Sequence, residues 1–413
     1  MKPFPDSFVL ICLFAGAPLF AGDIPTVPPA EVGLSAEKLA EVGRFMEKQV
    51  ADKKIAGGSV LIARHGKIAF SHSYGVIDLE TRKPVSADTI FRLYSMTKAI
   101  TTAAALNLVD AGKIHVNDPV SKYIPAFANL KVAAKEGLRA PEREMTVKDL
   151  MLHTSGLTYG GGPDALREAY LKLKPLESAN LEEMAEKLSK APLAYDPGTD
   201  WIYSVSIDVL GRIVEIASEE PLDAFLKKTI FDPLGMKDTD FSVPSEKLDR
   251  FATNYSRVPD GLKVADSPAK SHFAKKATFF SGGGGLVGTG NDYLRFLMMV
   301  QNGGEFEGVR ILKPETAKLM VTNQLPAKAF PIHFGKEVRH GTGFGFGFSV
   351  RTANMTWDPD ARVGEYGWGG AASTHYWVSP RDNLIAITLE QIVPYQWDTE
   401  FGIKKMVYDA IER

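Results

Sequence analysis

Segments with the composition of β-strands lie near both ends of this 413-residue chain and are scarce in its middle. Near the start, two apolar, β-rich runs flank the turn-forming sequence His65-Gly66-Lys67, which is typical of a β-hairpin. From about residue 343 the strand-like runs "GFGFGFSV", "STHYWVSP" and "NLIAITLEQIV" follow. Because a sheet must bury its apolar face, we expect one antiparallel sheet, built from both ends of the chain and covered by helices.

The middle of the chain, residues 115–280, is rich in Pro and Gly and contains runs typical of helices, such as "NLEEMAEKLSKAPL" and "SIDVLGRIVEIASEE". The sequence therefore predicts an α+β protein with two parts. Residues 23–114 and 281–413 would form the sheet domain, and residues 115–280 an inserted, mainly helical domain. Further helices are predicted over 35–53 and 95–111.

The first 22 residues, "MKPFPDSFVLICLFAGAPLFAG", combine a lysine, a short apolar run and small residues near the end. This pattern predicts a cleavable signal peptide at 1–22 and a secreted or periplasmic protein. The only cysteine, Cys12, lies in this segment, so the mature chain would have no thiol for disulfides, catalysis or metal binding. No later run is long enough to cross a bilayer, so we expect no stable membrane insertion.

Composition excludes some classes of partner. The formal charge is −2, and acidic and basic residues are mixed along the chain without a basic stripe, so nucleic acid is not expected to bind. The sequence contains no H-E-x-x-H or comparable histidine pair, and its glycine runs lack the features of nucleotide-binding loops. We therefore expect neither a metal nor a cofactor.

The stretch "FRLYSMTKAI" places Ser95 and Lys98 three residues apart at the start of a predicted helix. Residues i and i+3 share a helix face, so the two side chains can meet. A serine hydroxyl needs a base within hydrogen-bond reach to act as a nucleophile. A lysine can be that base only if its pKa falls, and burial lowers it. The alternative is a helix-capping serine and a solvated lysine, because S-x-x-K alone occurs often by chance.

Two downstream segments could complete a site. Tyr203 in "DWIYSVSIDVLG" precedes a predicted helix and could relay protons, although a loop tyrosine more often packs its ring. In "GEYGWGGAASTHYWVSP", Gly369 and Gly370 at the start of a strand predict the close approach of another group, with a ligand as a candidate beside Trp368. A substrate carbonyl there could be held by the Ala371 N–H.

The motifs "SMTK", "YSV" and "WGG" occur in an order and at spacings similar to those of the serine β-lactamase and penicillin-binding-protein fold. "HTSGL" and "SGGGGLVGTGNDYLRF" add to a likeness that covers about residues 30–410. The chain most resembles the family VIII carboxylesterases, relatives of class C β-lactamases. The resemblance implies Ser95 as the acylated nucleophile, Lys98 and Tyr203 as its activating pair, and the N–H groups of Ser95 and Ala371 as the oxyanion hole.

Two departures from the lactamase pattern bear on the substrate. Trp368 stands where class C β-lactamases carry the lysine of Lys-Thr-Gly, and Val205 stands where they carry an asparagine. A neutral indole cannot pair with a substrate carboxylate. We therefore expect an enzyme that hydrolyses neutral, short-chain carboxylic esters through Ser95, with weak activity on β-lactams. With one lysine fewer near the phenol of Tyr203, we expect Lys98 to be the main base.

Three other functions stay open at this point. A D-amino-acid peptidase or amidase and a β-lactamase would use the same acylation chemistry. A binding protein without catalysis could share the scaffold, although it would have no need for Lys98. The sequence does not fix the oligomeric state, the acyl chain length or the enantioselectivity.

Overall fold

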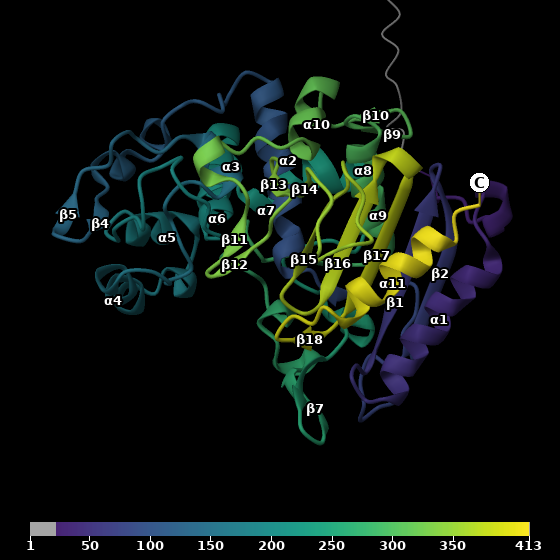
Figure 1. Cartoon of the computed structure of the whole chain (residues 1–413). Helices are drawn as coiled ribbons and strands as arrows, with labels where there is room; N and C mark the ends of the chain where they lie inside the picture. Colours follow the sequence, from purple (N-terminus) through teal and green to yellow (C-terminus); the bar gives the residue numbers. More distant parts are fainter. Residues whose placement is uncertain (1–21, 413) are drawn as a thin grey trace, which may run out of the picture.

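A seven-stranded antiparallel sheet forms the centre of the molecule, whose computed structural model describes residues 22–412 (Figure 1). The strand order is β13-β14-β15-β16-β17-β1-β2. These strands span Thr342–Phe344 (β13), Ser349–Arg351 (β14), Tyr366–Gly370 (β15), Thr374–Ser379 (β16), Leu384–Glu390 (β17), Gly57–Arg64 (β1) and Lys67–Gly75 (β2). The sheet is thus built from both ends of the chain, which confirms the predicted fold class.

The first hairpin forms where the turn signal predicts it. His65 and Gly66 have φ angles of 52° and 75°, the left-handed pair that a two-residue hairpin turn requires. On its other edge, β1 pairs with β17, so that Gly58 lies opposite Glu390. Six consecutive residues of β1 are buried, because helices cover both faces of the sheet.

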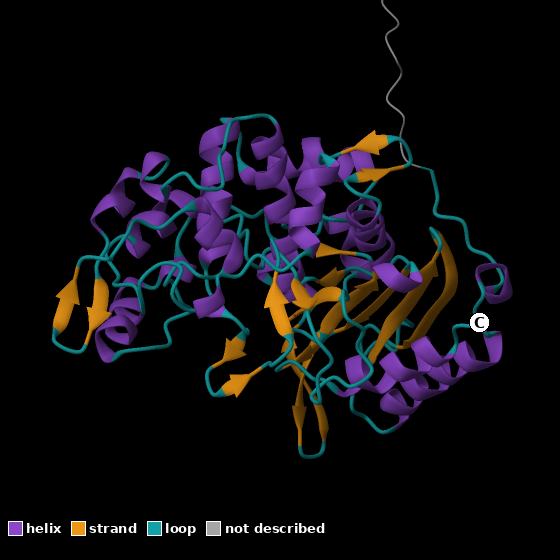
Figure 2. Ribbon diagram, turned by 45° about the horizontal axis from the view of Figure 1, so that its top comes forward, coloured by secondary structure: helices purple, strands orange, loops and turns teal. Residues whose placement is uncertain are grey.

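Helices α1 (Ala36–Ala51) and α11 (Asp398–Asp409) pack together on one face, and α2 (Thr97–Asp110) and α9 (Gly290–Gln301) lie on the other (Figure 2). Ser35 caps α1, and its hydroxyl accepts a hydrogen bond from the Lys38 N–H, as expected for a serine at this position. The remaining helices are α3 (Val147–Leu152), α4 (Asp164–Leu173), α5 (Leu181–Leu188), α6 (Ser206–Ser218), α7 (Leu222–Leu226), α8 (Asp232–Leu234) and α10 (Pro314–Val321).

Short strands outside the central sheet refine the prediction for the middle of the chain. Between 115 and 280 the structure is mainly helical, but it contains two hairpins, and one of them pairs with a strand near the C-terminus. The short strands are Phe91–Arg92 (β3), Val132–Ala134 (β4), Gly137–Arg139 (β5), Asn254–Val258 (β6), Gly261–Asp266 (β7), Val287–Gly288 (β8), Glu305–Phe306 (β9), Val309–Arg310 (β10), His333–Phe334 (β11), Glu337–Val338 (β12) and Ile392–Val393 (β18).

Two segments differ from their prediction or lie beyond the described part. The run "GFGFGFSV" is not one strand but β13 and β14 joined by a turn, in which Gly347 has a φ of 94°. The predicted signal peptide falls on residues 1–22, nearly all outside the described residues. The domain boundaries at 115 and 280 stay a prediction.

One buried carboxyl group in β17 gives the fold a pH-dependent stability. Glu390 is fully buried, and only Oε1 is hydrogen-bonded among the described side chains, at 3.4 Å from the Tyr74 hydroxyl. Burial raises the pKa of Glu390 to about 8, whereas an unfolded glutamate titrates near about 4.3. The native state therefore holds a proton that the unfolded state releases, and the free energy of unfolding falls as the pH rises between these values.

We expect Glu390→Gln to remove this loss of stability, so that its free energy of unfolding at pH 8 exceeds that of the parent by about 4 to 5 kcal/mol. Urea unfolding of both proteins at pH 5 and pH 8 measures the difference. The exposed Glu31→Gln serves as the control and should follow the parent at both pH values. Parallel pH dependences of the parent and Glu390→Gln would show that Glu390 is charged in the native state.

Candidate active site

Ser95 lies in a short 3₁₀ turn, Tyr94–Met96, that leads into α2. The structure brings the predicted pair together, with Lys98 Nζ 3.2 Å from Ser95 Oγ. Tyr94, directly before the serine, has a φ of 43°, a left-handed conformation that is costly for a bulky residue and is found at functional sites. The turn therefore presents Ser95 at the edge of α2 instead of within it.

Lys98 is buried, and its ammonium group is surrounded by oxygen atoms (exposed fraction 1%). Besides Ser95 Oγ, Nζ donates to the Tyr159 hydroxyl at 3.0 Å and to the Gly283 carbonyl at 2.6 Å. The ring of Tyr203 lies beneath it, with its centroid 4.5 Å from Nζ. This environment fixes the lysine beside the serine and supplies partners for all three of its N–H groups.

The polar surroundings overturn the expectation of a lowered lysine pKa. Burial by itself lowers the pKa of Lys98, but the neighbouring Tyr159, Tyr203 and Asp208 outweigh burial and hold this pKa above its ordinary value. Lys98 is therefore an ammonium group at neutral pH. This direction counts against Lys98 as the main base, and the identity of the base stays a prediction.

The glycine run after Ser281 forms the wall behind Lys98. The Gly283 N–H donates to Asp208 Oδ1 at 3.0 Å, and a Cβ at Gly283 would lie 2.4 Å from Oδ2 of the same carboxylate. Asp208 also accepts a hydrogen bond from the Ser281 hydroxyl. Buried Asp208 thus holds the loop whose carbonyl binds the lysine, and only glycine fits between them.

Tyr203 and Trp368 are in direct contact. The indole Nε1 of Trp368 donates a 3.0 Å hydrogen bond to the Tyr203 hydroxyl, and the two ring centroids are 5.2 Å apart. His153 packs against the other side of the tyrosine, 4.8 Å between centroids. Burial lowers the pKa of His153, so its ring is neutral.

The structure corrects the interpretation of the two glycines after Trp368. Gly369 and Gly370 lie at the end of β15, not at the start of a strand, and the closest group to Gly370 is the chain itself. A Cβ at Gly370 would lie 2.2 Å from the Leu93 carbonyl oxygen. The glycine therefore docks β15 against the segment that carries Ser95, and this contact places Ala371 at the same site.

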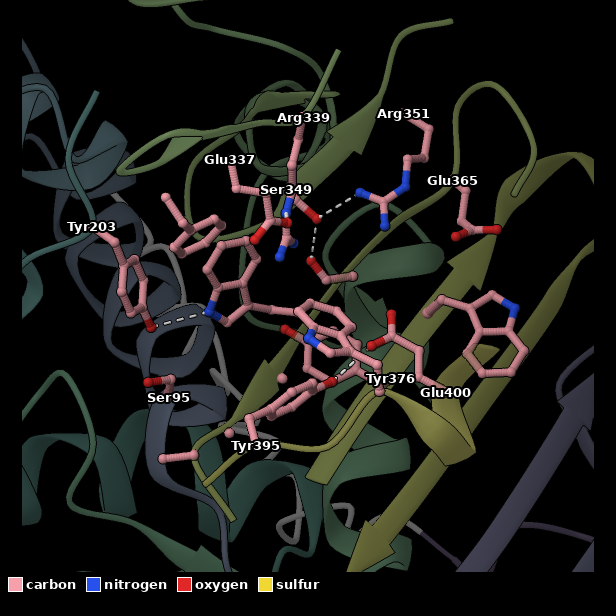
Figure 3. Close-up of a pocket in the computed structure, with 18 residues that line it drawn as sticks. Ser95, Tyr203, Glu337, Arg339, Ser349, Arg351, Glu365, Tyr376, Tyr395 and Glu400 are labelled. Atoms are coloured by element: carbon pink, nitrogen blue, oxygen red, sulfur yellow. Dashed lines mark hydrogen bonds and ion pairs between the residues drawn. The ribbon is translucent and has the colours of Figure 1, made fainter. Parts of the chain in front are cut away.

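A cavity of about 360 Å³ opens at this point. Ser95 and Tyr203 line it (Figure 3). Trp368, Gly369, Gly370 and Ala371 line it as well. Lys98 lies behind Ser95 and does not line the cavity. The pairing of the Ser95 and Ala371 N–H groups as an oxyanion hole stays a prediction.

Sequence reasoning missed two members of this site, Tyr159 and Asp208. Tyr159 follows the "HTSGL" motif directly, and Asp208 lies five residues after Tyr203 on α6. The position of Tyr159 between that motif and a glycine run could have identified it as a site residue. No comparable sequence feature marks Asp208. Ser155, the serine of the "HTSGL" motif, is structural, because its buried hydroxyl lies 2.7 Å from that of Ser206.

Within residues 22–412, no three His, Cys, Asp or Glu side chains are grouped so as to hold a metal ion. None of the helices in that range has the length and apolar character needed to span a bilayer.

Comparisons with known proteins agree with this geometry. The Beta-lactamase family model matches residues 42–401. Protein Rv1367c of Mycobacterium tuberculosis is 33% identical over 84% of this chain and 88% of its own length. Esterase EstB of Burkholderia gladioli is 30% identical over 90% of this chain and 95% of its own. The structure of EstCE1, described as a hydrolase with promiscuous acyltransferase activity, has a TM-score of 0.76 at 28% identity, covering 90% and 99% of the two chains.

The fold is therefore that of penicillin-binding proteins and β-lactamases. The match extends over nearly the whole described chain, and the three motifs meet at one cavity. The chain belongs to the Beta-lactamase family of serine hydrolases and, within it, to the family VIII esterases that its motifs resemble.

Proposed function

We propose that this protein is a serine carboxylesterase that hydrolyses neutral, short-chain esters through an acyl-enzyme on Ser95. The observation that carries the proposal is the 3.2 Å contact between Ser95 Oγ and Lys98 Nζ at the edge of a cavity bordered by Tyr203 and Trp368. The names of EstB, an esterase, and EstCE1, a hydrolase, support it.

We assign proton transfer to the tyrosine in this proposal. Lys98 is held as an ammonium group, so it orients the Ser95 hydroxyl and stabilises negative charge beside it. Neutral Tyr203 then relays the proton: its oxygen takes the proton of Ser95 as Oγ attacks the ester carbon, while its own hydroxyl proton passes to the departing alcohol oxygen. Water later attacks the acyl carbon, the acid leaves, and Ser95 is regenerated.

The indole of Trp368 favours a neutral ester over a β-lactam or a peptide C-terminus. Its only N–H donates to Tyr203 and is not available for a substrate carboxylate. Buried Val205 supplies no amide either. The groups expected to bind a carboxylate next to the serine are therefore replaced by apolar surface.

Hydrolysis of 4-nitrophenyl esters from acetate to octanoate, measured beside nitrocefin and a D-Ala-D-Ala peptide, tests the proposal. We expect the highest kcat/KM among the short esters, slow turnover of nitrocefin, and covalent labelling of Ser95 by a fluorophosphonate. Faster turnover of the peptide would assign a peptidase. No labelling and no turnover of any substrate would leave a binding protein.

A change at Trp368 probes the contact with the tyrosine. Trp368→Phe keeps an aromatic ring but removes the hydrogen bond to the Tyr203 hydroxyl. We expect kcat for 4-nitrophenyl butyrate to fall about tenfold with little change in KM, because the lost bond orients a proton-transfer group. Steady-state kinetics of both proteins measure it; an increase in KM alone would make Trp368 a substrate-binding wall only.

We also propose that the protein is exported. The lysine, short apolar run and small residues of positions 1–22 support this. N-terminal sequencing of the protein from a periplasmic or culture fraction should begin near Asp23. An intact N-terminus in the cytoplasmic fraction would contradict export.

A further inference from the structure

The cavity at Ser95 continues past Trp368 into a cluster of charged side chains. Arg339 and Arg351 line it on the side away from Ser95 (Figure 3). Glu365 and Glu400 line it as well, together with the aromatic residues Trp377, Tyr395 and Trp397. The proposed reaction gives no role to these groups.

The buried charges of this cluster balance one another. Lys404 donates to Asp358 and Glu365 at 2.8 Å each, and Arg351 lies 3.3 Å from Asp358. Glu400 accepts a 2.7 Å hydrogen bond from the Tyr395 hydroxyl.

Arg339 pairs with Glu337, whose side chain is largely exposed. With that exposed partner set aside, the buried members are three cations (Arg339, Arg351, Lys404) and three anions (Asp358, Glu365, Glu400). A further net charge entering this space would be uncompensated and costly.

Hydrogen-bond donors, by contrast, are in excess. A guanidinium has five N–H groups, yet Arg339 and Arg351 donate only three hydrogen bonds between them to the described residues, at 3.1 to 3.3 Å. The Nε of Arg351 is buried and has no partner there. Arg339 instead lies over aromatic rings, 4.4 Å from the centre of Phe334 and 4.6 Å from that of Trp397. Buried donors of this kind require acceptors.

We propose that this part of the cavity binds the alcohol part of the ester and selects alcohols that are uncharged but carry an oxygen acceptor, such as an amide or ketone carbonyl. The acceptor would meet the N–H groups of Arg339 and Arg351, and the absence of net charge would preserve the balance of the cluster. The inference rests on the proposed esterase function, which places the reacting carbonyl at Ser95.

The alcohol is assigned to this side because of the tyrosine. In the proposed reaction Tyr203 passes its hydroxyl proton to the alcohol oxygen, so that oxygen must lie at Tyr203 and its partner Trp368. In the same cavity the ring of Phe334 stacks on Trp368, with 6.1 Å between the centroids, and Arg339 lies over the ring of Phe334, so the charged cluster adjoins Trp368. A substituent of the alcohol that extends two or three bonds beyond the ester oxygen therefore points toward the arginines.

Three butyrate esters of matched shape test the proposal. The alcohols are 4-methylpentyl, 2-acetamidoethyl and 3-carboxypropyl, which are apolar, neutral with a carbonyl, and anionic. We expect kcat/KM for the acetamidoethyl ester to exceed that of the other two by about tenfold, the value of one hydrogen bond to a charged group. Equal rates, or a preference for the alkyl ester, would overturn the proposal, and a preference for the carboxylate would show that the cluster binds anions.

An acyl series of the same shapes separates the two arms of the ester. The ethyl esters of 5-methylhexanoic acid, of N-acetyl-β-alanine and of a monoanionic dicarboxylic acid place the apolar, the neutral carbonyl-bearing and the anionic group on the acyl side. Selectivity confined to this series would overturn the assignment to the alcohol. Failure of the parent to hydrolyse any ester, 4-nitrophenyl butyrate included, would contradict the proposed function itself.

Arginine variants connect the selectivity to the cluster. Arg351→Lys and Arg339→Lys keep the charge but lose the forked donor geometry. We expect each to bring the ratio of kcat/KM values for the acetamidoethyl and alkyl esters toward one. Arg310→Lys, at an exposed arginine of β10, should leave the ratio unchanged. Thermal unfolding of all three verifies that they fold, and an unaltered ratio in both cavity variants would overturn the proposal.

Discussion

Replacing Ser95 by alanine is expected to reduce kcat/KM for 4-nitrophenyl butyrate by about 10⁴-fold or more, because no other group can form the acyl-enzyme. The side chain is small and only partly buried, so the variant should unfold at nearly the same temperature as the parent. Loss of the fluorophosphonate adduct in intact-mass spectra gives an independent measurement.

Ser155→Ala is the matched control for this experiment. Ser155 is the other serine in a short motif, two residues from His153, and its hydroxyl faces that of Ser206 inside the protein. We expect its activity to stay within a few-fold of the parent, while its stability falls by about 1 kcal/mol because a buried hydroxyl loses its partner. The reverse result, with Ser155→Ala inactive and Ser95→Ala active, would show that the nucleophile is Ser155 in the "HTSGL" motif and not Ser95.

Tyr203→Phe is expected to lower kcat by about 10³-fold, as much as Lys98→Ala, because the tyrosine is the proton-transfer group and the lysine is already protonated. Stability separates the two variants. Lys98→Ala leaves buried Asp208 without its positive neighbour and should also unfold more easily. Tyr203→Phe removes only a hydroxyl that accepts from Trp368.

The pH–rate profiles of these variants identify the base. If Tyr203→Phe kept a tenth or more of the parent activity while Lys98→Ala were inactive, the lysine would be the base after all. Tyr159→Phe is the control, because it removes one acceptor from the same ammonium group without lining the cavity at Ser95. We expect a loss of about tenfold for that variant.

The sequence predicted those parts of the site that depend on local spacing. Ser95 and Lys98 are three residues apart, and a single helical turn brings them together whatever surrounds them. The hairpin at His65-Gly66 is equally local, since its turn residues determine the pairing of β1 and β2. The two-ended sheet followed from the positions of the strand-like runs.

The electrostatic environment of Lys98 was not predictable in the same way. Its pKa depends on Tyr159, Tyr203 and Asp208, which all approach from segments at least 61 residues away. The apolar neighbours in sequence suggested a dry pocket and a neutral amine. Similarly, Gly370 looked like a ligand contact because the sequence cannot show that the Leu93 carbonyl occupies that space.

The pairing of β1 with β17 has a consequence for biosynthesis. During translation, Ser95, Lys98 and Tyr203 emerge from the ribosome long before Ala371 and strand β17, which pairs with β1 at Gly58, are synthesised. Strands that are far apart in the sequence pair slowly, because closing the long segment between them costs conformational entropy before the contacts form. We therefore expect the nascent chain to have no esterase activity until its last strands have emerged, so that an incomplete enzyme would not hydrolyse esters in the cell.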